Sequence, residues 1–296
     1  MKGHDPVLLD EVLEGLAPAT GEHLLDLTLG RGGHARRILE ATAPDGRLTG
    51  VDRDPQAHAW SADELPGDRI ALIHGNFGDL PDLRQRIGSG TWDLILADLG
   101  VSSPQIDEGD RGFSFRFDGP LDMRMDPTRG ETAAHLVASS TEEQLQNLIG
   151  QLGEDRHARK IAAAIVRARA VEPITTTARL ASGIRDAVPV SRGNHLDAAT
   201  RTFQALRISV NGELEALQHL LDRIGNLLSP AGRLAIISYH SLEDRKVKER
   251  FRTLAREGDH RLLTTRPVRP SGQEIRRNPR SRSARMRIIQ RLGGSA

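Results

Sequence analysis

The residues best placed to do chemistry surround a glycine-rich turn near the start of the chain. The stretch Asp26-Leu-Thr-Leu-Gly30-Arg-Gly-Gly33-His34 follows an apolar run and precedes a helical pattern. Glycines let the backbone turn sharply and approach a ligand, and the start of the following helix offers unpaired N–H groups. Asp52 lies twenty residues beyond Gly32, where its carboxylate can accept hydrogen bonds from two ribose hydroxyls. The spacing predicts a nucleotide-type cofactor at this corner.

Two cofactor classes fit this turn. The pattern Gly-x-Gly-x-x-Ala from Gly30 to Ala35, with an acid twenty residues beyond Gly32, satisfies the dinucleotide fingerprint. It therefore indicates NAD as readily as S-adenosylmethionine. A glycine-rich turn that binds no ligand is the third interpretation.

Three features favour S-adenosylmethionine. Asp26 ends the first apolar run, where a carboxylate can meet the methionine ammonium but would repel a pyrophosphate. Asp98 ends the fourth run and is followed by a turn that contains Pro104, an arrangement typical of methyltransferases that act on amino groups. Phe77 follows the third run, where an adenine ring would be flanked. The alternative interpretation of Asp98 is an ordinary turn-capping residue.

The elements that must position these residues alternate between strands and helices. We expect strands at 23–29, 47–52, 69–74 and 92–99, and helices at 34–43, 55–64 and 80–87. Strands separated by single helices imply a parallel sheet with right-handed crossovers. The predicted fold class is α/β, with a Rossmann-like sheet of the class I methyltransferase type.

The alternation stops in the middle of the chain. No convincing strand pattern lies between 107 and 207, whereas helices are expected from Thr141, over 156–171 and over 177–187. The α/β pattern then resumes with a helix at 213–228, a strand at 233–238, a helix at 241–257 and a final edge strand at 284–290. We therefore predict a methyltransferase core at 1–106 and 208–296, with an inserted all-helical subdomain for substrate recognition at 107–207.

Composition excludes several classes of site. The chain of 296 residues contains no cysteine, which rules out disulfides, cysteine-ligated metals and a thiolate nucleophile. We predict no metal site. The N-terminus carries acids among its apolar residues, and no stretch approaches the ~20 apolar residues of a membrane span. We therefore expect a cytoplasmic protein.

Positive charge is concentrated at the C-terminal end, although the whole chain has a net charge of only +1. Residues 241–296 hold 16 Lys and Arg against 6 Asp and Glu. This bias is typical of a surface that faces a polyanion, most simply RNA. The alternative is a solvated basic tail.

Nine stretches spread over the chain are longer and more distinctive than the glycine-rich turn. They are His4-Asp-Pro-Val-Leu-Leu-Asp-Glu11, Gly30-Arg-Gly-Gly-His34, Asp52-Arg-Asp-Pro-Gln56, Asp98-Leu-Gly-Val-Ser-Ser-Pro-Gln105, Arg111-Gly-Phe-Ser-Phe115, Asp118-Gly-Pro-Leu-Asp-Met-Arg-Met-Asp126, Arg201-Thr-Phe-Gln-Ala205, Ser238-Tyr-His-Ser-Leu-Glu-Asp244 and Asn278-Pro-Arg280. In these stretches the chain resembles the bacterial 16S ribosomal RNA cytosine-N4 methyltransferase family.

The resemblance implies a reaction, a cofactor and a set of contacts. The reaction is methylation of the exocyclic amine of a cytosine in the decoding region of 16S rRNA, position 1402 in the family's usual name, within the assembled small subunit. The cofactor is S-adenosylmethionine on a class I fold with a helical insertion. The implied cofactor contacts are Gly32, Gly33, His34, Asp52, Phe77, Asp98 and Gln105. Where other class I enzymes have the first glycine after the strand-one acid, this chain has Thr28.

Cytosine N4 is a poor nucleophile because its lone pair is delocalised into the ring. An acceptor for the N4 proton must therefore be positioned beside it. Asp98 is the first candidate and His240 the second, although His240 also fits a satisfied histidine at a strand end. The target base must leave its stack, and the loop 111–124 could hold it. Equally, Phe113, Phe115 and Phe117 could simply pin that loop.

The sequence also fits three functions other than cytosine-N4 methylation. One is an NAD-dependent oxidoreductase, and another is a non-catalytic RNA-binding ribosome assembly factor that kept the fold. A third is a class I methyltransferase that acts on a protein or a small molecule. The absence of cysteine excludes cytosine C5 methylation through a thiolate.

Overall fold

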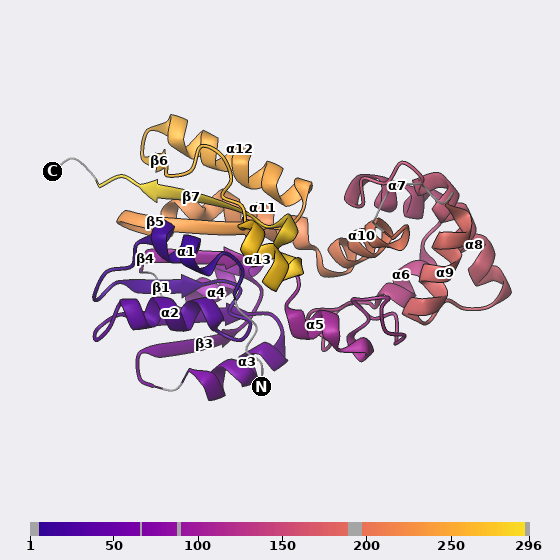
Figure 1. The fold of residues 1–296 in the computed structure, drawn as a ribbon, viewed down its shortest axis with the longest axis horizontal. Coiled ribbons are helices and arrows are strands. Elements are labelled where there is room, and N and C mark those ends of the chain that lie inside the picture. The colour runs from indigo at the N-terminus through magenta and orange to yellow at the C-terminus, as the bar shows by residue number, and fades with distance from the viewer. Residues whose placement is uncertain (1–5, 66, 88–89, 189–196, 294–296) are drawn as a thin grey trace. The chain divides into compact units, whose positions relative to one another are not determined.

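The chain folds into two compact units in a computed structural model that describes residues 6–65, 67–87, 90–188 and 197–293 (Figure 1). The first unit combines residues 1–100 with 214–296, and the second spans 101–213. The predicted limits of the insert, 107 and 207, lie six residues inside those of the second unit. His4 and Asp5, which open the first of the nine matching stretches, lie outside the described residues.

Within the described residues of the first unit, seven strands form one sheet in the order β3-β2-β1-β4-β5-β7-β6. Strands β1 to β5 are parallel, and β7 is antiparallel to both β5 and β6. The strands are β1 (His23–Asp26), β2 (Arg47–Asp52), β3 (Ile70–His74), β4 (Trp92–Asp98), β5 (Leu228–Ser238), β6 (His260–Leu262) and β7 (Arg285–Arg291). The predicted Rossmann-like α/β sheet is confirmed.

Helices cover both faces of this sheet because its strands alternate apolar side chains between two cores. Leu24 packs on one face with α1 (Leu9–Leu16) and α2 (Gly33–Ala41). Its neighbour Leu25 packs on the other face with α4 (Leu80–Ile87), α11 (Glu213–Arg223) and α12 (Ser241–Glu257). Between β2 and β3 lies α3 (Pro55–Glu64), which Asp54 caps by accepting a hydrogen bond from Gln56 N. The predicted helices of the first half are confirmed to within two residues at each end.

Two segments of the basic C-terminal region, 260–262 and 285–291, are strands of the sheet. The predicted edge strand at 284–290 is β7, but β6 pairs with its outer side, so the prediction that it lies at the edge was wrong. Three residues are too few for β6 to produce a recognisable alternation. Strand β5 starts at Leu228 rather than at the predicted Arg233, because the Ser-Pro-Ala-Gly segment continues the strand. Before β7 lies the short helix α13 (Gly272–Arg277).

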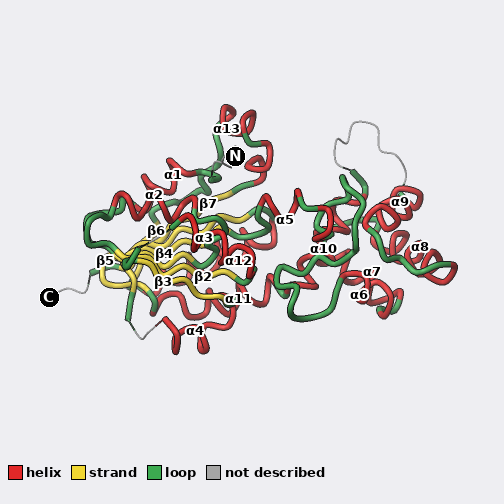
Figure 2. Tube along the Cα trace, turned by 90° about the horizontal axis from the view of Figure 1, so that it is seen from below, coloured by secondary structure: helices red, strands yellow, loops and turns green. Residues whose placement is uncertain are grey.

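The second unit is helical and has its own core. Its helices are α5 (Ser103–Asp107), α6 (Ala133–Ser139), α7 (Glu142–Leu152), α8 (Ala158–Val171), α9 (Thr177–Ala187) and α10 (Ala199–Asn211). The predicted helix start at Thr141 is a capping box with Gln144. The helix predicted over 156–171 is α8, and its Ile161 and Ile165 are buried in the core of this unit. Among the described residues of this unit, the β-type pairing is a single bridge between Pro120 and Thr176 (Figure 2).

No described helix has both the length and the apolar character needed to cross a membrane.

Candidate active site

Three acidic side chains meet at the carboxyl edge of the sheet. Asp26, Asp52 and Asp98 are the last residues of β1, β2 and β4. Strand β1 lies between β2 and β4. The strand order therefore reverses at β1: β2 and β3 follow on one side of it, and β4 and β5 on the other. Open α/β sheets bind their ligands in the crevice at such a switch point. The carboxylates that the sequence placed at strand ends are therefore neighbours at the expected ligand edge.

The glycine-rich turn joins β1 to α2 in a conformation that requires glycine. Gly30 has φ 54° and Gly32, the N-cap of α2, has φ 71°. A Cβ on Gly32 would lie 2.5 Å from Cδ1 of Leu65, and one on Gly33 would lie 2.7 Å from Cγ of Pro6. Close packing against the protein, and not only the approach of a ligand, thus explains these glycines.

Asp52 is anchored to this turn. One carboxylate oxygen accepts a hydrogen bond from Gly30 N at 2.7 Å, and the other accepts one from Asp54 N at 2.8 Å. Burial raises the pKa of Asp52, against the effect of these two bonds. Each oxygen keeps a lone pair for a further donor. The carboxylate is therefore held in one orientation beside the turn.

The pKa values of Asp26 and Asp98 are both raised by burial. Asp26 is 1% exposed, and the Asp98 side chain is 23% exposed. Burial raises the pKa of Asp26 to about 7, and the nearby charges of Asp98 and Asp52 act in the same direction. Burial likewise raises the pKa of Asp98 to about 7. A ligand that carries positive charge would stabilise both carboxylates in their ionised form.

Thr28 explains why this chain departs from the usual glycine after the strand-one acid. Its backbone N donates to Oδ1 of Asp26 at 3.0 Å, and its Oγ1 accepts a hydrogen bond from Asp98 N at 2.6 Å. The threonine side chain therefore ties the end of β4 to the turn after β1. A glycine could not make the second bond.

Tyr239, the single tyrosine of the chain, is a site residue that sequence reasoning missed. Its hydroxyl donates a hydrogen bond to Oδ1 of Asp98 at 2.8 Å. This bond lowers the pKa of Asp98, partly offsetting burial. Burial and the Asp98 charge raise the pKa of Tyr239 well above its usual value, so the phenol stays protonated and remains a donor. No signal in the sequence indicated this contact, because it depends on the register that pairs Asp98 with Ile237, two residues before Tyr239.

His34 completes the surroundings of Asp98. Its ring Nε2 is 2.8 Å from Val7 O, and its Nδ1 is 4.0 Å from Oδ2 of Asp98. The side chain is buried, and burial lowers its pKa. His34 therefore lines the site with an uncharged imidazole ring.

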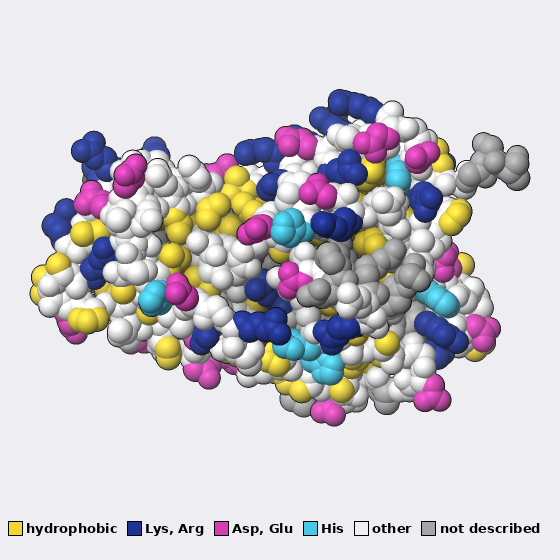
Figure 3. Space-filling model, turned by 180° about the vertical axis from the view of Figure 1, so that it is seen from behind, with side chains coloured by type: hydrophobic (Ala, Val, Ile, Leu, Met, Phe, Trp, Pro, Cys, Tyr) yellow, Lys and Arg dark blue, Asp and Glu magenta, His cyan; other side chains and the backbone are white. Residues whose placement is uncertain are grey.

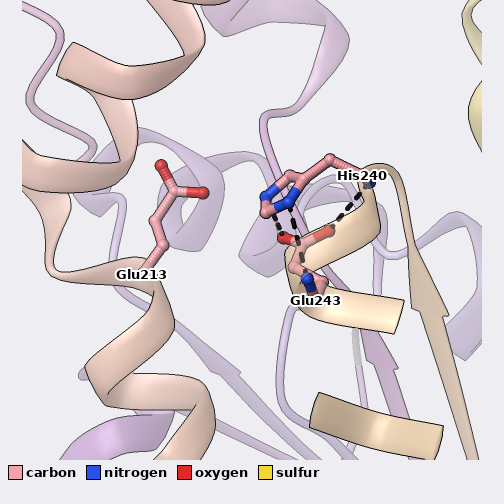
Figure 4. Close-up of side chains that lie close together, drawn as sticks. All are labelled: Glu213, His240 and Glu243. Atoms are coloured by element: carbon pink, nitrogen blue, oxygen red, sulfur yellow. Dashed lines mark hydrogen bonds and ion pairs between the residues drawn. The ribbon is translucent and has the colours of Figure 1, made fainter. Parts of the chain in front are cut away.

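His240 has a different setting. It is the N-cap of α12 and forms a capping box with Glu243 (Figure 4). The ring Nε2 lies 3.2 Å from the Glu243 carboxylate, which also accepts a hydrogen bond from Tyr239 N at 2.8 Å. In the described part of the chain, Asp98 contacts Tyr239 and His34, and no contact joins it to His240. His240 is therefore held at the start of α12, where its buried Nε2 approaches Glu243 without forming a hydrogen bond.

The two other predicted cofactor contacts lie in different units. Phe77 begins the short 3-10 helix η1 (Phe77–Asp79) after β3 and is partly buried against the core of the first unit. Gln105 lies in α5 of the second unit, where it is buried and its Oε1 accepts a hydrogen bond from Ser102 N. Gln105 is therefore fixed by the capping box that starts α5.

The sequence matches the MraW methylase family model over residues 1–292. The chain belongs to the MraW methylase family. A relative from Syntrophotalea carbinolica is 48% identical over 98% of this chain and 98% of its own, and one from Thermomicrobium roseum is 49% identical over 98% and 94%. A third, from Cyanothece sp., is 50% identical over 98% and 95%. Each of the three is named a ribosomal RNA small subunit methyltransferase H.

Membership of this family makes the chain an S-adenosylmethionine-dependent methyltransferase, and the site fits that cofactor. The carboxyl groups of the buried Asp26 and the partly exposed Asp98 suit a ligand that carries a sulfonium and an ammonium. The same pair would repel the diphosphate of NAD. The oxidoreductase alternative is therefore wrong.

Several of the C-terminal arginines have structural roles. Arg285 and Arg287 pair with Asp244, and Arg291 donates a hydrogen bond to Leu228 O. Others, such as Arg276 and Arg282, are exposed. On the face drawn in Figure 3, Lys and Arg are interspersed with acidic and histidine side chains rather than gathered in one block. Attraction of a polyanion therefore depends on particular local sites.

Proposed function

We propose that this protein transfers the methyl group of S-adenosylmethionine to the exocyclic N4 of cytosine 1402 in 16S rRNA. The substrate in this proposal is the decoding region of the small ribosomal subunit, which places the reaction in the cytoplasm. Support comes from the family, from the names of relatives that share about half of the residues, and from the stretches that resemble the cytosine-N4 enzymes. The observation that carries the proposal is the partly exposed Asp98 carboxylate at the end of β4.

In this proposal the carboxyl edge of the sheet holds the cofactor. Asp52 accepts hydrogen bonds from the ribose, Asp26 faces the ammonium, and Phe77 flanks the adenine. The turn at Gly32 and Gly33, together with His34, lines the rest of the cofactor site. Gln105 is included among the cofactor contacts because the resemblance to the family implies it. When bound, the cofactor supplies a methyl group on a cationic sulfur.

Asp98 is the proposed acceptor of the N4 proton. A carboxylate hydrogen-bonded to the amine favours its tetrahedral form and takes the proton as the new N–C bond forms. A group whose pKa lies near the working pH performs this task best, and burial raises the pKa of Asp98 to about 7. Tyr239 holds the carboxylate by its other oxygen, Oδ1. His240 acts indirectly, because it fixes the start of α12 next to Tyr239.

The second unit is proposed to recognise the RNA. Two of its three loop phenylalanines pin the loop: Phe115 packs edge-to-face on Phe203 at 4.9 Å, and Phe113 packs against the core. Phe117 is 55% exposed. Its ring is therefore available to stack on an extruded base.

The test is transfer of a labelled methyl group from S-adenosylmethionine to small subunits that lack this modification. The expected product is N4-methylcytosine at a single position, identified by mass spectrometry of the nucleosides and mapping of the RNA. Label on another atom, or on protein, would overturn the proposal. Binding of subunits without any transfer would favour the non-catalytic assembly factor.

A further inference from the structure

A hollow in the first unit is lined by residues of α12, of β6 and the segment after it, and of β7. Five polar side chains line it: Lys248 and Arg252 from α12, Thr264 and Thr265 after β6, and Arg287 from β7. The ring of Phe251 forms part of its apolar floor. We call this feature the α12 hollow. Three cations and two hydroxyls around one concave surface match the chemistry of an oxyanion.

Positive charge in the α12 hollow exceeds the negative charge. Asp244 of α12 receives hydrogen bonds from Arg287, which lines the hollow, at 2.7 and 3.2 Å and pairs with Arg285 at 3.5 Å. Two arginines therefore already neutralise this carboxylate. Across the described ranges, Lys248 and Arg252 form neither an ion pair nor a hydrogen bond. Lys248 adds to the positive charge that surrounds Asp244, so the cations of the hollow outnumber this carboxylate and can attract an anion from solution.

A hydroxyl donor is also oriented in the α12 hollow. Thr264 Oγ1 accepts a hydrogen bond from Ile288 N at 2.9 Å. A hydroxyl that accepts from the backbone keeps its own proton for another acceptor. The threonine is thereby fixed in place as a potential donor to a bound oxyanion.

Part of the α12 hollow lies near the level of Asp98 along the sheet, because Arg287 pairs with Ile236, one residue before the partner of Asp98. Strand β6 runs in the direction of β5, because both are antiparallel to β7, so Thr264 follows the carboxyl end of β6. Strands β4 and β6 are separated by three strand spacings, or about 14 Å. A strand of RNA that presents a base to Asp98 could therefore reach the hollow with a phosphate a few nucleotides away.

We infer that the α12 hollow binds a backbone phosphate of the RNA substrate and sets the position of the strand relative to the active site. This inference rests on the proposed function. Phosphate contacts of this kind position a nucleic acid without reading its sequence. Lys248 and Arg252 supply charge, Thr264 supplies a directed donor, and Arg287 is held ready by Asp244.

The test compares two double variants with equal loss of charge. Lys248→Gln with Arg252→Gln removes the two unpaired cations of the hollow. The control, Arg47→Gln with Arg256→Gln, removes two exposed arginines from the start of β2 and the last turn of α12. Affinity for small subunits is measured over a range of salt concentrations, and S-adenosylmethionine affinity is measured by calorimetry.

We expect the hollow variant to lose about tenfold in kcat/KM for subunits, the effect of a lost charge-assisted contact. The slope of log affinity against log salt should fall by roughly one, with cofactor affinity unchanged. A hollow variant that matches the control would overturn the inference while leaving the methyltransferase proposal intact. Absence of methyl transfer by the unmodified protein would instead overturn the proposed function.

Binding of inorganic phosphate distinguishes a site for small free anions from a site for the phosphates of RNA. If phosphate alone binds to the unmodified protein, and the hollow variant abolishes that binding without changing subunit affinity, the hollow is not an RNA subsite. If phosphate competes with subunits for the unmodified protein but not for the hollow variant, the RNA assignment is supported.

Discussion

Asp26→Asn should make the free protein more stable at pH 8 and weaken its hold on the cofactor. Asp26 is 1% exposed, and burial raises its pKa from 3.8 to about 7. Because the folded-state pKa is raised, the folded chain binds more protons than the unfolded chain between about pH 4 and 7. The free energy of unfolding therefore decreases as pH rises through this window. Asparagine keeps an oxygen for Thr28 N but cannot ionise.

The size of the effect follows from the shift. Three pKa units at 1.36 kcal/mol each set an upper limit of about 4 kcal/mol above pH 7. Relaxation and water penetration reduce this figure, so a gain of about 1–4 kcal/mol at pH 8 is expected, with little change at pH 4. The cofactor should bind more weakly to the variant, because the ligand's positive charge loses an ionised partner.

Urea unfolding of the free protein at pH 4 and pH 8, with calorimetry of S-adenosylmethionine binding, measures both effects. Asp45→Asn is the control, because it removes an exposed carboxylate. Equal stability changes at the two pH values, or unchanged cofactor affinity in the variant, would refute the reasoning about Asp26.

Three further substitutions test the site. Asp52→Ala should weaken cofactor binding by about 1.5–3 kcal/mol in calorimetry, and unchanged affinity would remove Asp52 from the ribose role. Tyr239→Phe removes a bond that lowers the pKa of Asp98, so the acid limb of the pH–rate profile should move to higher pH. A profile that does not move would separate Tyr239 from the titrating group. Gly32→Ala forces a side chain into φ 71° and against Leu65. It should cost at least about 1 kcal/mol in urea unfolding, and full stability would contradict the described turn.

The gathering of acids at one edge was predictable from the sequence. Asp52 ends its predicted strand and Asp98 lies one residue before the end of its own, whereas Asp26 lies three residues before the predicted end at Leu29. Parallel strands bring their carboxyl ends to one edge, so alternation with helices was enough to place the three together. Local spacing likewise indicated the helix start at Thr141, where α7 begins with a capping box, whereas the capping box of His240 with Glu243 at the start of α12 was not predicted.

Contacts between distant segments were not predictable in this way. The bond from Tyr239 to Asp98 joins residues 141 positions apart, and the bond from Asp98 N to Thr28 spans 70. Both depend on the register of neighbouring strands, which one sequence does not reveal. The internal position of β7 was missed because its partner β6 has three residues. Charge counting alone could not separate Arg285 and Arg287, which pair with Asp244, from the exposed arginines.

The most direct test of the account is the rate of a single turnover by Asp98→Asn with cofactor and subunits both saturating. Asparagine keeps the size of the side chain and one acceptor but removes the charge and the basicity. If Asp98 accepts the N4 proton, the rate should fall by about 10²–10⁴, the usual range for general-base catalysis. A variant that turns over at the wild-type rate, with only a raised KM for S-adenosylmethionine, would show that Asp98 binds the cofactor and is not the base.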